Sequence, residues 1–156
     1  MVEPLSVAAS VVGLVTAAVQ MSNILYKMGS TIKDAPVLAQ TAAGELNDIS
    51  LVLAQLQKYI DGRVQASTQR LCLITVEHIT ATLTGCVITF SELDAILKSV
   101  NIDTGLRTWD RALWLLKKDK IASVITRLQN HKSTLGLMLN IMQWYAFLIC
   151  WMGILC

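Results

Sequence analysis

Four cysteines and two histidines are the side chains of this chain best suited to metal or thiol chemistry. They are Cys72, Cys86, Cys150, Cys156, His78 and His131. No two cysteines form a Cys-x-x-Cys pair, and neither histidine lies at ligand spacing from a cysteine or a carboxylate cluster, as a zinc site would require. We therefore expect no metal and no cofactor, and we interpret the cysteines as buried, reduced side chains of a cytoplasmic protein.

Catalytic motifs are missing from the sequence as well. Serine, histidine and aspartate all occur, but there is no nucleophile elbow, no paired-acid motif and no Gly-x-x-x-x-Gly-Lys-Ser/Thr phosphate loop. Such residues are more common as helix caps and surface groups than as catalytic residues. The sequence thus predicts that the chain is not an enzyme.

Positive charge is concentrated in the last third of the chain. Residues 1–103 carry a net charge of −3, whereas residues 104–156 carry +5. The candidate basic face consists of Lys117, Lys118, Lys120 and Arg127. These side chains could contact anionic lipid or nucleic acid, although a solvated helix face is the commoner explanation. Nucleic acid is disfavoured, because the nearby aromatic residues are only Trp109 and Trp114.

The uncharged segment from Pro4 to Tyr26 is long enough to span a bilayer. Its acidic start disfavours a secretory signal. Apolar residues recur at alternating steps of four and three, which is typical of a helix packed in a bundle. This candidate seam, for packing or for membrane action, consists of Val7, Val11, Leu14, Ala18, Met21 and Leu25, and it continues to Met28. Bundle packing is the favoured interpretation, with the helix beginning near Pro4 and ending at 29–31.

Three further helices follow from similar patterns. Asp34 and Pro36 begin the second, which ends near Ile60 before Asp61-Gly62. The third is expected from a Ser67 cap to about Val100, and the fourth from a Thr108 cap. Their predicted apolar seams are Ala42, Leu46, Ile49, Leu53, Leu56 and Ile60; Leu71, Val76, Ile79, Leu83, Val87, Phe90, Leu93 and Leu97; and Ile121, Ile125, Leu128, Leu135, Leu139 and Met142.

Four residues in the last two of these helices carry particular expectations. Gly85 indicates close packing or a bend. Lys132 interrupts the fourth seam, so its stem should lie along the core with the ammonium in water. Trp109 and Trp114, near the start of the fourth helix, are expected to be packing anchors, although tryptophans at a membrane interface would give the same pattern.

The chain ends in an apolar tail, residues 144–156, that lacks a polar helix face. Its candidate anchor residues are Trp144, Phe147, Leu148, Ile149 and Trp151. Three interpretations remain open: a membrane tail anchor with the preceding basic residues in the cytosol, a segment that covers the bundle, or residues that come from a truncated or misspliced gene and do not belong to the natural fold. Residues 1–143 would then form one domain, an all-α antiparallel four-helix bundle, with a fifth helix as an alternative.

Several short stretches resemble the N-terminal domain of fungal STAND proteins, a HeLo-like domain found in fungal NOD-like receptors. The resemblance rests on residues 3–14, 33–36, 82–87, 90–93, 109–114 and 128–135, and it extends to about Gln143. It implies an antiparallel helical bundle that acts in signalling or cell death, in some relatives by releasing the first helix into a membrane. The sequence departs from that family's pattern at about Trp144, and it contains no Gly-x-x-x-x-Gly-Lys-Ser/Thr phosphate loop of the nucleotide-binding domain that normally follows.

Two functions follow as expectations. The first is a non-enzymatic signalling module that acts by self-association or by docking a protein partner, because every predicted helix is amphipathic and no active site is visible. The second is a membrane-acting effector that uses the first helix, or a protein anchored through the tail. The expected location is the cytoplasm, with membrane association in the second case.

Overall fold

The computed structural model describes residues 4–31, 36–61, 76–99 and 107–151. These residues form the helices α1 (Pro4–Thr31), α2 (Pro36–Ile60), α4 (Val76–Ser99) and α5 (Arg107–Trp151), and the described part of the chain contains no strand. The predicted all-α fold is confirmed. α1 and α2 span the predicted residues. Their bounds could be predicted because each helix begins at a proline and is followed by a polar or glycine-containing segment.

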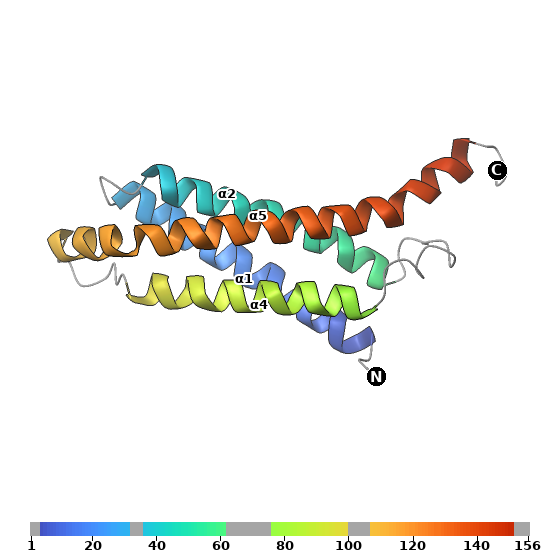
Figure 1. Ribbon diagram of the computed structural model, residues 1–156, viewed down its shortest axis with the longest axis horizontal. Coiled ribbons are helices and arrows are strands. Elements are labelled where there is room, and N and C mark those ends of the chain that lie inside the picture. Colours follow the sequence, from blue (N-terminus) through green and yellow to red (C-terminus); the bar gives the residue numbers. More distant parts are fainter. Residues whose placement is uncertain (1–3, 32–35, 62–75, 100–106, 152–156) are drawn as a thin grey trace.

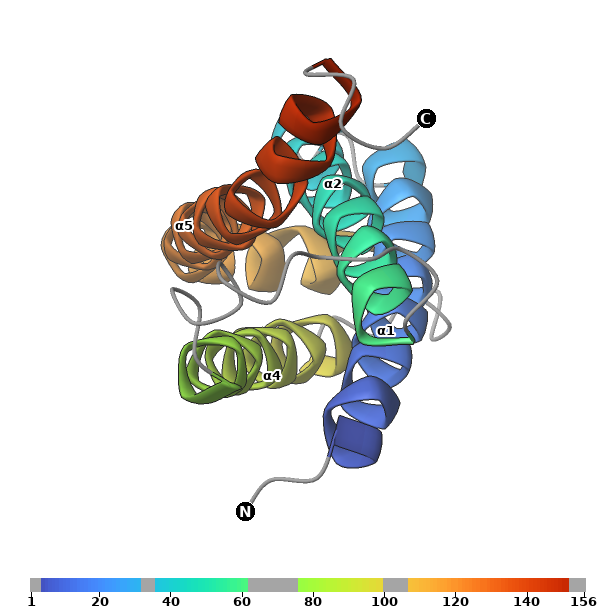
Figure 2. The ribbon, with the colours of Figure 1, turned by 90° about the vertical axis from the view of Figure 1, so that its right-hand side faces the viewer.

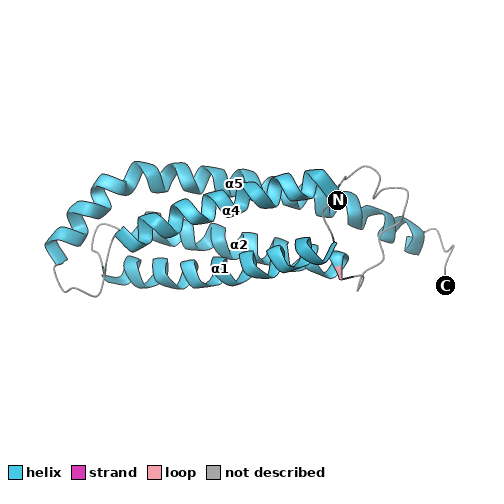
Figure 3. Ribbon diagram, turned by 90° about the horizontal axis from the view of Figure 1, so that it is seen from below, coloured by secondary structure: helices cyan, strands magenta, loops and turns pink. Residues whose placement is uncertain are grey.

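The four helices run alternately up and down and form a bundle (Figure 1). Viewed along its length, the bundle places α1 and α2 on one side and α4 and α5 on the other (Figure 2). α1 makes its largest contact with α2 and its smaller one with α4, while α5 packs on both α2 and α4. Seen from below, α5 continues past the other helices toward the C-terminus (Figure 3). Its 45 residues correspond to about 68 Å of helix, well beyond the 24 to 28 residues of its neighbours.

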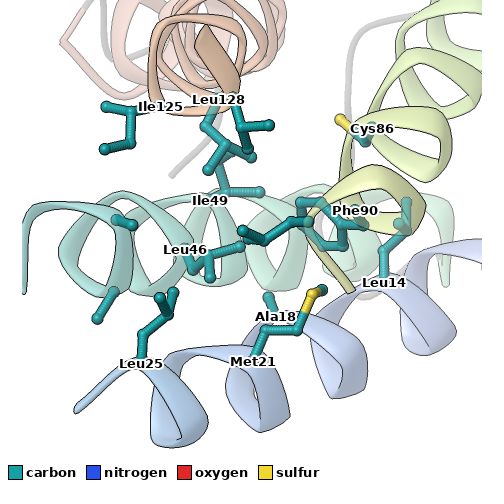
Figure 4. Close-up of a cluster of buried hydrophobic side chains, with 14 of the residues drawn as sticks. Leu14, Ala18, Met21, Leu25, Leu46, Ile49, Cys86, Phe90, Ile125 and Leu128 are labelled. Carbon is teal, nitrogen blue, oxygen red and sulfur yellow. The ribbon is translucent and has the colours of Figure 1, made fainter. Parts of the chain in front are cut away.

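The predicted apolar seams form the core (Figure 4). On α1, the seam from Val11 to Met28 is buried, while the side chain of Val7 lies outside the described part. The buried residues that the other helices contribute include Leu46, Ile49 and Leu53 of α2, Leu83, Phe90 and Leu93 of α4, and Ile121, Leu128 and Leu135 of α5. Trp114 is also buried, as predicted. One continuous core therefore joins the four helices.

Two features of α4 and α5 differ from the prediction. Val87 is exposed, because Cys86 takes the buried position one turn after Leu83 and turns Val87 outward. α5 begins at Arg107, so Thr108 lies in its first turn and does not precede it as a cap. The predicted Ser67 cap and Leu71 lie outside the described residues. The loss of a polar face at Trp144 does not end the helix, since α5 continues to Trp151.

Gly85 of α4 packs closely against the His131 side chain of α5. A Cβ atom built on Gly85 would lie 2.7 Å from Cε1 of His131, far inside van der Waals contact. The His131 ring also forms a hydrogen bond of 3.0 Å between its Nε2 and the Thr89 hydroxyl. This bond explains why Thr89, a polar residue, is buried. The predicted close packing at Gly85 is confirmed, and its cause is an imidazole ring.

Gly85→Ala should destabilise the protein by about 1 kcal/mol, although alanine favours helix by about that amount, because the methyl group displaces His131 from Thr89. Gly44→Ala is the matched control. No atom lies within 4 Å of its new methyl group, so this change should stabilise by about 0.5 to 1 kcal/mol. Urea unfolding measures both.

The His131→Ala background makes the test specific. There the ring is gone, so Gly85→Ala should become stabilising like the control. A destabilisation that persists in this background would contradict the steric explanation.

Candidate functional site

One long face of α1 is exposed and carries no charge. From Ala9 to Tyr26 the helix contains no charged residue, and its exposed apolar side chains are Val12, Val19, Ile24 and Tyr26, each 40–47% accessible. Val12, Val19 and Tyr26 recur every seven residues, so they lie along one line of the helix. A surface helix normally carries charged residues on its outer face. We call this surface the α1 outer face.

A groove of about 400 Å³ borders this face between α1 and α4. Leu14, Met21 and Phe90 form its apolar part, and Figure 4 shows Phe90 of α4 beside Leu14 of α1. Ile24 and Val87 also line it, and both side chains are partly accessible. The groove exists because α1 is packed more closely on α2 than on α4. The α1 outer face and the groove therefore adjoin each other, and the ion pair of Asp94 and Lys98 lies in the lining of the groove.

The predicted basic face is divided by the structure. Lys117, Lys120 and Arg127 line a second hollow, between α4 and α5, while Lys118 is exposed and does not line it. Arg127 forms a two-pronged ion pair with the carboxylate of Glu92, with one of the two contacts at 3.0 Å. This hydrogen-bonded pair lowers the pKa of the Glu92 carboxyl and raises that of Arg127.

A polar cluster joins α5 to α2. Lys132 Nζ lies 2.6 Å from Glu45 Oε2 and 3.0 Å from Asp48 Oδ2, and Gln129 donates to Glu45 Oε1 at 3.0 Å. We call these four residues the α2/α5 polar cluster. Hydrogen bonds from Lys132 to Glu45 and Asp48 raise the pKa of its ammonium. The prediction that this ammonium reaches water is therefore incomplete, because two carboxylates bind it at the edge of the core.

Cys86 is buried, and His131 is partly buried between α4 and α5. Burial raises the pKa of the Cys86 thiol to about 11, so it stays protonated and is a poor nucleophile near neutral pH. Burial, assisted by the nearby charge of Arg127, lowers the pKa of His131. Within the described ranges, no three His, Cys, Asp or Glu side chains gather in a way that could hold a metal ion. Cys72 and the side chains of Cys150 and Cys156 lie outside those ranges.

Two described helices are long and apolar enough to cross a membrane by length and composition. They are Ala9–Ser30, with a mean hydropathy of 1.4, and Glu77–Ser99, with 1.3, and about one third of each is buried. Core helices of soluble proteins satisfy the same criterion, so composition alone assigns no membrane role. The predicted tail anchor is described only in part. The backbone of residues 144–151 is helical, but the side chains of the candidate anchor residues lie outside the described part of the chain, namely Trp144, Phe147, Leu148, Ile149 and Trp151.

The comparison with known families identifies the chain. Residues 2–144 match the family described as the N-terminal domain of the pigment biosynthesis cluster protein PigL. The chain belongs to this family. The match covers the described bundle and ends at the first residue of the apolar tail. No curated protein and no solved structure matches the chain significantly.

Two features of the structure are absent from the sequence-based predictions. The first is the α1 outer face, although the seven-residue spacing of Val12, Val19 and Tyr26 is a signal for it. The α2/α5 polar cluster had no such signal, because Asp48 and Lys132 are 84 residues apart.

Lys132→Met should destabilise the protein by about 1 to 3 kcal/mol, because it keeps the apolar stem but leaves Glu45, with a side chain only 13% accessible, without its cation. Lys98→Met is the matched control: its partner Asp94 is exposed, so the loss should stay below about 0.5 kcal/mol. Equal losses in the two variants, measured by thermal or urea unfolding, would contradict a structural role for the cluster.

Proposed function

We propose that this chain is a non-enzymatic, cytoplasmic interaction module that acts by self-association, in the manner of the fungal STAND effector domains that its sequence resembles. The observation that carries the proposal is the uncharged α1 outer face next to the α1/α4 groove. A long uncharged helix face with several exposed apolar side chains is typical of a surface that a partner covers. The buried, reduced thiol of Cys86 supports the cytoplasmic location.

The partner that best fits this face is a second copy of the chain. A twofold interface places each surface against itself, so like charges on it would repel. The α1 outer face has no charge from Ala9 to Tyr26, and it therefore meets its own copy without that repulsion. The segment from Ala9 to Tyr26 extends for about 27 Å, which allows two antiparallel α1 helices to pair over several turns.

Val19→Glu should shift the protein from dimer to monomer and raise the dimer dissociation constant at least about tenfold, because an unpaired carboxylate would enter the interface. Val37→Glu is the matched control, since Val37 is also an exposed helical valine but lies on α2. Light scattering across a concentration series measures the change. A wild-type chain that stays monomeric throughout, or an equal effect of both variants, would contradict the proposal.

A second candidate function is membrane binding through α1, favoured by the apolar Ala9–Ser30 segment and its limited burial. Release of α1 would have to break its packing on α2, including the hydrogen bond from Ser22 to the Ala43 carbonyl at 3.2 Å. The contact between α1 and α2 is the largest between any two described helices. Contacts of α1 with lipid would therefore have to replace the packing energy that α1 loses on release. The apolar tail provides an alternative route to the same membrane.

Liposome flotation of the full chain distinguishes these routes. If α1 inserts, Val19→Glu should lower the bound fraction strongly, because a charge at the centre of a spanning helix costs about 2.5 to 3.5 kcal/mol. Leu148→Glu in the tail should then have little effect. The reverse result assigns binding to the tail, and absence of flotation eliminates the membrane candidate.

A further inference from the structure

The hollow between α4 and α5 is open to solvent and rich in positive charge. Its volume is about 450 Å³, within the range of small-molecule sites. Ala95, Ile96 and Val124 form its apolar wall. Its polar lining consists of Lys117, Lys120, Ser123, Arg127 and Glu92. We call it the basic hollow.

Two of its cations have no counter-ion among the residues that the structure describes. The single carboxylate in the lining, Glu92, is bound through both oxygens to Arg127. Lys117 and Lys120 have no hydrogen-bond or ion-pair partner among the described residues, and neither has the Ser123 hydroxyl. The basic hollow thus presents a fixed guanidinium, two unpaired ammonium groups and a hydroxyl toward one space.

We propose that the basic hollow binds the phosphate group of a small phosphate ester or of a lipid headgroup. A phosphate monoester carries a charge of about −1.5 to −2 at neutral pH, which the two unpaired lysines match. Ammonium groups bind phosphate oxygens as point charges, and each has three donors. Ser123 supplies a further donor, and Ala95, Ile96 and Val124 offer an apolar surface to the carbon part of the ligand.

The arrangement of the cations favours one compact phosphate group over a polynucleotide. Lys117, Lys120 and Arg127 follow one another at steps of three and seven residues along one side of α5, so they line the same hollow. Among the described residues, no aromatic side chain lines the hollow, whereas proteins that bind single-stranded nucleic acid stack bases on such side chains. The Glu92 carboxylate holds the Arg127 guanidinium against α4 and limits its reach along a longer polyanion.

Isothermal titration of the full chain with inorganic phosphate and glycerol 3-phosphate tests the proposal. Lys117→Gln and Lys120→Gln should each weaken binding about five- to tenfold, as expected for the loss of one charge-assisted contact. Lys118→Gln is the matched control, because it removes the same charge from an exposed lysine outside the lining and should change affinity less than about twofold. Lys117→Arg should restore binding in part, since the positive charge is kept.

Vesicles of phosphatidylcholine with and without phosphatidic acid separate the two sources of phosphate. Binding of glycerol 3-phosphate in solution identifies a small ester, and binding only to the vesicles with phosphatidic acid identifies a headgroup. Either result supports the proposal if Lys117→Gln weakens the observed binding more than Lys118→Gln does. Failure of every probe, equal effects of the two variants, or tighter binding of a single-stranded oligonucleotide with a steep salt dependence would overturn it. Because the basic hollow lies away from the α1 outer face, Val19→Glu should leave this binding unchanged.

Discussion

The close packing of α1 on α2 is the contact on which the rest of the bundle depends. Ala18 on α1 and Ala39, Ala42 and Ala43 on α2 are completely buried, and small side chains let two helix backbones approach closely. Ser22 reinforces the contact by donating to the Ala43 carbonyl across the interface. Because one side of α1 packs on α2, the rest of its surface faces solvent or makes the smaller contact with α4. The α1 outer face and the groove both follow from this asymmetry.

Polar contacts of α5 determine how the two halves of the bundle fit together. Arg127 and His131 bind Glu92 and Thr89 on α4, while Lys132 binds carboxylates of α2. Apolar seams can slide past one another by a turn at modest cost, whereas a paired charge or a buried hydroxyl tolerates only one alignment. The energetic value of such pairs is small where they are exposed. Their contribution here is to select one alignment of α5 against α2 and α4.

The outer surface of the bundle carries two chemically different regions. On the α1 side the surface is uncharged and partly apolar, and on the α4/α5 side it is a basic hollow with unpaired lysines. α4 lies between them and contributes Val87 and Phe90 to the first and Ala95 and Ile96 to the second. A ligand or partner at either region would therefore contact the same helix.

The sequence by itself determined the helices and most of the core. Pro4, Pro36 and Asp61 define where α1 and α2 begin and end, because proline, capping and stop signals act locally on the backbone. The three-four spacing of apolar residues predicted the buried seams for a similar reason, since a helix repeats every 3.6 residues. Membership of the PigL N-terminal family is likewise a property of the sequence.

Only the tertiary structure decided which neighbouring residues of a seam are buried and which cations are paired. Cys86 and Val87 are adjacent and equally compatible with an apolar face, and the position of α1 and α5 around α4 buries the first and exposes the second. Arg127 is paired with Glu92, whereas Lys117 has no ion-pair partner in the described part of the chain, although both belong to the predicted basic face. These outcomes depend on contacts between residues 35 to 84 positions apart, and a local periodic pattern carries no information about such distant pairs.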